Sequence, residues 1–208
     1  MDGVLVDSYA AHLESWRRLA REMGRSITEA QFTATFGRTS REIISELFSE
    51  IDADRIRVLD DRKEAIYRDL IRQDIPAMPG AADLVRRCVE AGFRVGVGSS
   101  GPAANVALVC EGMGLSGLLD AVVSGADVRR GKPDPEVFLL AASRLGVEPA
   151  RCVVIEDAPV GVEAARRAGM RCVGLTSSHR VESLSRADCV VDSLAGVATA
   201  LLANLTQA

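Results

Sequence analysis

The stretch that decides the fold is Cys152-Val153-Val154-Ile155-Glu156-Asp157-Ala158-Pro159. Its first four residues are apolar and mostly β-branched, which is typical of a parallel strand buried on both faces. Pro159 indicates a helix start, because proline suits the first helical position. The helical pattern ends at Gly169, and the run 172–175 reads as a second strand. This order predicts a right-handed βαβ unit, and therefore a parallel sheet.

The same alternation continues on both sides of this unit. Asp134 and Pro135 predict the N-cap and the first residue of another helix. The expected helices lie at 79–92, 102–113, 134–146 and 159–169, and the expected strands at 93–98, 121–124, 152–155, 172–175 and 189–191. Strands separated by single helices predict an α/β fold with a Rossmann-like parallel sheet core.

The region from about residue 10 to residue 77 has a helical pattern without a convincing strand. Two apolar stripes recur at helical spacing, Leu13, Trp16, Ala20 and Met23 in the first and Ile56, Leu59, Lys63, Ile66 and Leu70 in the second. We therefore expect an α-helical cap domain at 10–77, inserted into a core formed by 1–9 and 78–208. Asp7-Ser8 is expected to cap its first helix. Trp16 belongs to the first stripe and is expected in the core of the cap.

Composition narrows the classes of partner. The chain has 208 residues, a net charge of −4 and 48% hydrophobic residues, so it has no basic field for nucleic acid. Its five cysteines form no C-x-x-C pair, which favours reduced packing residues. No apolar run reaches membrane-spanning length, and Asp2 and Asp7 are unlike a signal peptide. We expect a cytoplasmic monomer or weak homodimer without nucleic-acid or membrane partners.

Polar residues follow several of the expected strands. Ser99-Ser100-Gly101 follows the first strand, Gly131-Lys132-Pro133-Asp134-Pro135 comes after the second, and Glu156-Asp157 follows the third. Ligands of an open parallel sheet bind beyond these carboxyl ends. Hydroxyls and a lysine can hold phosphoryl oxygens, adjacent carboxylates can hold Mg²⁺, and Asp2 can move a proton. Singly, these residues could be a surface lysine, turn serines and a helix cap, but together they indicate phosphoryl transfer.

The whole chain resembles the haloacid dehalogenase superfamily, in its branch with a small helical cap. Residues 1–8, Met-Asp-Gly-Val-Leu-Val-Asp-Ser, match the first motif, Asp-x-Asp-Gly, from its second position onward. Ser99 matches the second motif, Lys132 in Gly-Lys-Pro-Asp-Pro the third, and Glu156-Asp157 the fourth.

The resemblance implies a role for each matched residue. Asp2 is implied as general acid/base, with its carbonyl as a metal ligand. Asp157 is implied to bind Mg²⁺, with Glu156 beside it or one water away, while Ser99, Ser100 and Lys132 hold phosphoryl oxygens. The nucleophilic Asp would precede Met1 directly, so we expect these 208 residues, taken alone, not to turn over phosphate esters.

Three functions remain open at this point. The favoured one is a Mg²⁺-dependent phosphatase that acts on a small organic phosphate, such as a sugar phosphate, through an aspartyl-phosphate. The alternatives are a phosphomutase of the β-phosphoglucomutase type and a non-catalytic phosphometabolite-binding protein. His12, Arg38 and Arg41 are the candidate substrate residues of the cap, although a solvated surface arginine is the simpler interpretation of each arginine.

Overall fold

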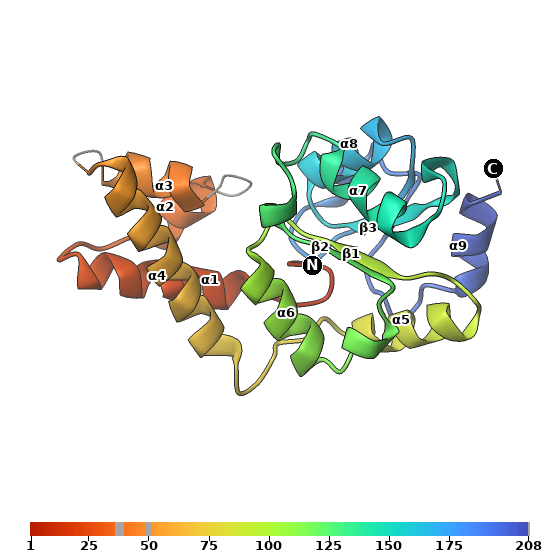
Figure 1. Cartoon of the computed structure of the whole chain (residues 1–208), viewed down its shortest axis with the longest axis horizontal. Helices are drawn as coiled ribbons and strands as arrows, with labels where there is room; N and C mark the ends of the chain where they lie inside the picture. The colour runs from red at the N-terminus through yellow and green to blue at the C-terminus, as the bar shows by residue number, and fades with distance from the viewer. Residues whose placement is uncertain (36–39, 49–50, 208) are drawn as a thin grey trace. The chain divides into compact units, whose positions relative to one another are not determined.

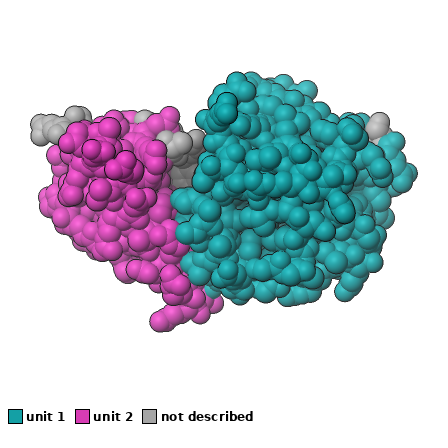
Figure 2. Space-filling view, viewed as in Figure 1, with its two compact units in different colours: residues 1–7, 75–208 teal, residues 8–74 magenta. Residues whose placement is uncertain are grey.

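A computed structural model describes residues 1–35, 40–48 and 51–207 of the chain. The described chain divides into two compact units (Figure 2). Unit 1 consists of Met1–Asp7 with Ile75–Ala208, and unit 2 consists of Ser8–Asp74. The sequence placed these divisions at 9/10 and 77/78.

Unit 1 contains parallel strands in two groups. β1 (Gly96–Gly98) pairs with β2 (Ala121–Val123), with Gly96 opposite Ala121. β3 (Val153–Glu156), β4 (Arg171–Leu175) and β5 (Cys189–Val191) form a second sheet in that order, with Val153 opposite Arg171. Every pairing between these strands is parallel, which confirms the predicted α/β class.

Helices cover both faces of the strands in unit 1. Figure 1 shows α7 and α8 on one side of the strands and α5 and α6 on the other. The bounds are Ala81–Glu90 for α5, Ala103–Gly112 for α6, Glu136–Leu145 for α7, Pro159–Arg167 for α8 and Thr199–Leu205 for α9. Short 3₁₀ turns lie at Ser116–Leu118 (η1), Gly125–Asp127 (η2), Pro149–Arg151 (η3) and Val181–Leu184 (η4). One buried apolar cluster joins the strands to α7 and α8, and its members include Val123, Phe138, Val162 and Cys172.

Three local expectations differ from the structure. The strand expected at 93–98 is regular only over β1, because Val95 N–H donates to the Asp120 side chain instead of continuing the ladder. The N-cap of α7 is Pro135, and Asp134 lies one residue earlier, where its carboxylate accepts the Glu136 N–H at 3.1 Å. The apolar residues of β3 are half-buried rather than buried, because among the described strands β3 pairs only with β4.

Unit 2 is helical in its described residues. It contains α1 (Tyr9–Glu22), α2 (Glu29–Ala34), α3 (Ser40–Leu47) and α4 (Ala53–Ile71). Trp16 is 3% exposed within the apolar cluster of this unit, so its expected core position is confirmed. Ser8 is the N-cap of α1, as predicted, but its side chain makes no capping hydrogen bond, because its backbone is already helical. None of the helices among the described residues is long and apolar enough to cross a membrane.

Candidate active site

The start of the chain packs against the carboxylate of Asp157. Gly3 has a φ of +67°, a left-handed conformation that glycine adopts without strain, and its N–H donates to Val6 O at 2.9 Å. A Cβ at Gly3 would overlap the Asp157 carboxyl group and lie 2.9 Å from Ser178 Oγ. Only glycine therefore allows the backbone beside Asp2 to approach Asp157 this closely.

The loop after β1 brings Ser99 toward Asp2. Ser99 is buried, and its N–H donates to Val123 O at 2.9 Å, while its hydroxyl accepts the Gly101 N–H at 3.1 Å. A Cβ at Gly101 would lie 3.3 Å from Ser99 Oγ and 3.9 Å from Asp2 Oδ2. The Ser99 hydroxyl and the Asp2 carboxylate thus flank the same point of this loop. The Ser100 side chain is exposed at the next position.

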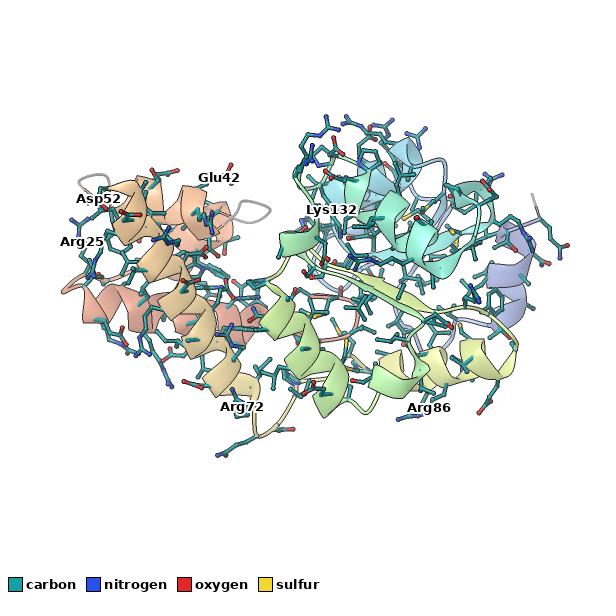
Figure 3. The ribbon with its side chains drawn as sticks, in the orientation of Figure 1. Arg25, Glu42, Asp52, Arg72, Arg86 and Lys132 are labelled. Atoms are coloured by element: carbon teal, nitrogen blue, oxygen red, sulfur yellow. The ribbon has the colours of Figure 1, made fainter. Side chains whose placement is uncertain are left out.

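Lys132 and Glu156 form a buried ion pair. Their side chains are 11% and 7% exposed, and the ammonium also lies 4.7 Å from the centre of the Phe138 ring. The other carboxylate oxygen of Glu156 accepts the N–H groups of Asp157 and Ala158 at 2.9 and 3.0 Å. The N-cap of α8 is Ala158 and not Asp157. The backbone N–H groups just before α8 are satisfied by the Glu156 carboxylate. Figure 3 shows Lys132 on the loop that precedes α7.

The two neighbouring carboxylates have opposite pKa shifts. Burial raises the pKa of Glu156, but the Lys132 ammonium, the N-terminal ammonium and the Ala158 N–H together outweigh it, and the net shift is downward. Burial and the negative charge of Glu156 raise the pKa of Asp157 above its usual value, although Ser178 donates a hydrogen bond to it. Lys132 thus neutralises one carboxylate and leaves the other as a buried charge that a cation would stabilise.

This donor set fits a hard divalent cation. Mg²⁺ takes oxygen ligands and is commonly held by one or two carboxylates together with waters and substrate phosphate. Asp157 supplies such a carboxylate, and the backbone next to Asp2 lies against it. Across residues 1–35, 40–48 and 51–207, no group of three or more His, Cys, Asp or Glu side chains forms an all-protein metal site. Mg²⁺ does not need a complete set of protein ligands, whereas a structural Zn²⁺ ion does.

Residues after β4 also contact this site, and no motif of the sequence indicated them. The Ser177 hydroxyl donates to Gly3 O, the Ser178 side chain bonds Asp157, and His179 Nδ1 lies 3.0 Å from Asp157 O. They follow a predicted strand, so the rule that ligands bind beyond strand ends could have found them.

The candidate cap residues lie in unit 2. His12 Nδ1 is 2.9 Å from the buried Lys63 ammonium, and the His12 ring stacks on Tyr67 at 4.1 Å. Arg41 donates to Asp60 at 3.0 Å. Arg38 lies outside the described residues. The structure thus brings Asp2, Ser99, Lys132, Glu156 and Asp157 together in unit 1 and gives His12 and Arg41 partners in unit 2.

Comparison with known proteins identifies the family of this chain. A family model described as haloacid dehalogenase-like hydrolase matches residues 1–169. This chain belongs to the haloacid dehalogenase-like hydrolase family. The predicted resemblance to this family is therefore confirmed.

Several curated relatives of this haloacid dehalogenase-like hydrolase are named as phosphatases, and one is named as a phosphomutase. Validoxylamine A 7'-phosphate phosphatase of Streptomyces hygroscopicus subsp. limoneus is 35% identical over 95% of this chain and 92% of its own length. Fructose-1-phosphate phosphatase YqaB of Escherichia coli is 32% identical over 83% and 92%. Among solved structures, a β-phosphoglucomutase from Clostridium difficile is 27% identical and superimposes with a TM-score of 0.85 over 99% and 94%.

Proposed function

We propose that this haloacid dehalogenase-like hydrolase is a Mg²⁺-dependent phosphatase of small organic phosphates, with sugar phosphates as the favoured class. The observation that carries the proposal is the buried Lys132–Glu156 pair beside Asp157 and Gly3. A buried lysine held in place by a carboxylate, next to a second buried carboxylate, is suited to neutralise a phosphoryl group. Its place at the ends of parallel strands supports a ligand site over a purely structural pair.

The residues of unit 1 would divide the chemistry between them. Ser99, Ser100 and Lys132 would bind the phosphoryl oxygens. Asp157 and the Asp2 carbonyl, with Glu156 beside them, would hold Mg²⁺, which neutralises phosphate charge when bound.

Asp2 would supply the proton transfers of the reaction. It would first protonate the leaving oxygen and then take a proton from the water that attacks the aspartyl-phosphate. The motif matched by residues 1–8 has its nucleophilic aspartate at the position directly before Met1. We therefore propose that turnover requires an aspartate at that position and that the 208 residues alone do not supply it.

The cap would select the organic part of the substrate. His12 and Arg41, on unit 2, carry polar or charged groups that would contact the substrate, and Arg38 is the third candidate substrate residue. The named substrates of two relatives, validoxylamine A 7'-phosphate and fructose 1-phosphate, support a polyhydroxylated phosphate ester. Closing of a cap over such a substrate would exclude water from the site.

A phosphomutase is the second candidate. It is favoured by the structural similarity to a β-phosphoglucomutase and by a 27% identical β-phosphoglucomutase of Bacillus subtilis. A mutase would return the phosphoryl group to a sugar hydroxyl, whereas a phosphatase would release inorganic phosphate.

A panel of sugar phosphates tests these proposals. The protein is the chain extended upstream by an apolar strand that ends in aspartate directly before Met1. Phosphate release with Mg²⁺, lost with EDTA, would support the phosphatase. Interconversion of hexose 1- and 6-phosphate without net release would support the mutase. Mg²⁺-dependent binding without either reaction would favour the binding protein and overturn both enzymatic proposals.

A further inference from the structure

Ser124, Asp127 and Arg144 form a hydrogen-bonded cluster next to the loop that carries Ser99. Asp127 Oδ2 accepts the Ser124 N–H at 2.8 Å and the Ser124 hydroxyl at 2.6 Å. Asp127 Oδ1 accepts Arg144 Nη2 at 2.6 Å, and the other terminal nitrogen of Arg144 donates to Val122 O. Arg144 belongs to the last turn of α7, so this helix is tied to both the end of β2 and the η2 turn.

The η2 turn in turn fixes the Ser99 loop. Gly125 begins η2, and its N–H donates to Gly101 O at 2.9 Å. A Cβ at Gly125 would overlap the Ser100 carbonyl oxygen and lie 3.3 Å from Gly101 O. The two backbone segments are therefore in direct contact, and a shift of Gly125 must move Ser100 and Gly101.

We infer that Asp127 and Arg144 are positioning residues for phosphoryl binding, which act through Ser124 and Gly125 on the loop that carries Ser99. The inference rests on the proposed phosphoryl-transfer function of that loop. Asp127 itself does not touch the phosphoryl site in this scheme. Its two oxygens instead anchor η2 to α7, and η2 holds the hydroxyl of Ser99 at the angle that a phosphoryl oxygen requires.

Ser124 and Asp127 form the capping box of η2, and the contacts of Arg144 go beyond this local role because they join η2 to α7. Ser124 is 2% exposed, so its polar groups need partners, but a surface turn could satisfy them without a second helix. Hydrogen bonds from Ser124 and Arg144 hold the pKa of Asp127 far below its usual value, so the carboxylate is charged near neutral pH and can accept both hydrogen bonds there.

Two substitutions test the anchor from different sides. Asp127→Ala removes the carboxylate that accepts hydrogen bonds from Ser124 and Arg144. Gly125→Ala adds a Cβ that would overlap the Ser100 carbonyl oxygen. Misplacing a binding group by a fraction of an ångström lowers reactivity strongly, so kcat/KM should fall on the order of tenfold to a hundredfold. The affinity for inorganic phosphate, measured on the 208-residue chain by calorimetry, should fall as well. The value of kcat/KM should fall by the same factor for every substrate, because all substrates share the phosphoryl group.

Matched controls separate positioning from general damage. Gly117→Ala adds a Cβ that meets no heavy atom within 4 Å, and Asp83→Ala removes an exposed carboxylate paired with Arg86 on α5. Both controls should keep phosphate affinity and kcat/KM. Asp127→Asn keeps an oxygen for Ser124 but turns an amide toward Arg144, so it should retain more activity than Asp127→Ala. The melting temperature of each variant is recorded so that unfolding is not mistaken for loss of positioning.

The outcomes separate this inference from the function on which it rests. If the 208-residue chain binds phosphate and the chain with aspartate before Met1 turns over phosphate esters, while folded Asp127→Ala and Gly125→Ala variants match them, the positioning role is wrong and the proposed function stands. A loss that differs from substrate to substrate would also contradict it, since that pattern belongs to the cap. If the 208-residue chain does not bind phosphate and the chain with aspartate before Met1 turns over no ester, the proposed function fails and the inference fails with it.

Discussion

Lys132 and Glu156 join two distant parts of the chain, the loop before α7 and the end of β3, through one buried ion pair. The pair places a positive charge at the strand ends and orders the backbone where α8 begins, because Glu156 also accepts the N–H groups of Asp157 and Ala158. The proposed phosphoryl binding and the local folding at the start of α8 therefore depend on the same two side chains.

Breaking this pair should destabilise unit 1. Lys132→Met leaves Glu156 buried without its cation, and such changes cost about 3–5 kcal/mol of unfolding free energy. Urea unfolding measures the loss. The double variant Lys132→Met/Glu156→Gln should recover much of it while remaining unable to turn over substrate. An exposed change, Glu182→Gln, serves as the control. Equal stability of Lys132→Met and the parent would show that the pair is not formed.

The stabilisation from Glu156 should depend on pH in one direction. Its pKa is lower in the folded chain than the ordinary value of about 4.3 for glutamate. The unfolded state therefore takes up a proton first, so the contribution is present above this ordinary value and is lost as the pH falls through the folded value. Urea unfolding from pH 7 down to pH 3 should show a smaller acid-induced loss in Glu156→Gln than in the parent.

Gly161 should be irreplaceable even by alanine. A Cβ at this position would overlap the carboxyl group of Glu156, which lies directly against α8. Gly161→Ala should cost about 1–3 kcal/mol, the usual range for overpacking, and should also lower kcat/KM by moving Glu156. Gly196→Ala adds a methyl group where no heavy atom lies within 4 Å and should leave both quantities unchanged. If Gly161→Ala behaved like Gly196→Ala, the close packing of Glu156 on α8 would be refuted.

Asp157→Asn should stabilise the protein in EDTA. The pKa of Asp157 is raised by burial and by Glu156, so its ionisation opposes folding once the pH exceeds the ordinary aspartate value of about 3.9. The amide removes this penalty. Mg²⁺ should then raise the melting temperature of the parent but not of Asp157→Asn, because a ligand that binds only the folded state stabilises it. A Mg²⁺ response that survives in Asp157→Asn would place the metal elsewhere.

Arg41→Ala should alter substrate selection without altering the chemistry. Its side chain is 65% exposed but that of its partner Asp60 is only 17% exposed, so the stability cost should be on the order of 1 kcal/mol, at the upper end of the range for surface pairs. If the cap contacts the organic part of the substrate, KM should rise for some esters and not for others. The expected rise is on the order of tenfold, which corresponds to ~1.4 kcal/mol of binding free energy. Arg57→Ala, which removes another exposed arginine paired on α4, is the matched control. A uniform change across the panel would contradict a selective role.

The sequence predicted the parts of this molecule that depend on local pattern. The helix starting at Pro159, the left-handed Gly146 that ends α7 and the β5 run at 189–191 are all confirmed. Family motifs also identified Ser99, Lys132 and Asp157 as candidates before any geometry was known.

What the sequence did not predict depends on contacts between distant segments. The Ser177 hydroxyl meets Gly3 across the whole length of the chain, and Arg144 meets Asp127 from another helix. Serine and arginine are common surface residues, so their local sequence carries no sign of these partners. The half-exposure of Val153 and Val154 likewise depends on which strands lie beside β3 and not on their apolar character.

The most direct test of the central claim is phosphate release by the chain with aspartate directly before Met1. It is compared in Mg²⁺ with its own Lys132→Met and Asp2→Asn variants and with the 208-residue chain. We predict turnover of at least one sugar phosphate by the extended chain, and loss on the order of a hundredfold or more in the other three. Turnover by the 208-residue chain, or undiminished turnover by Lys132→Met, would contradict the account.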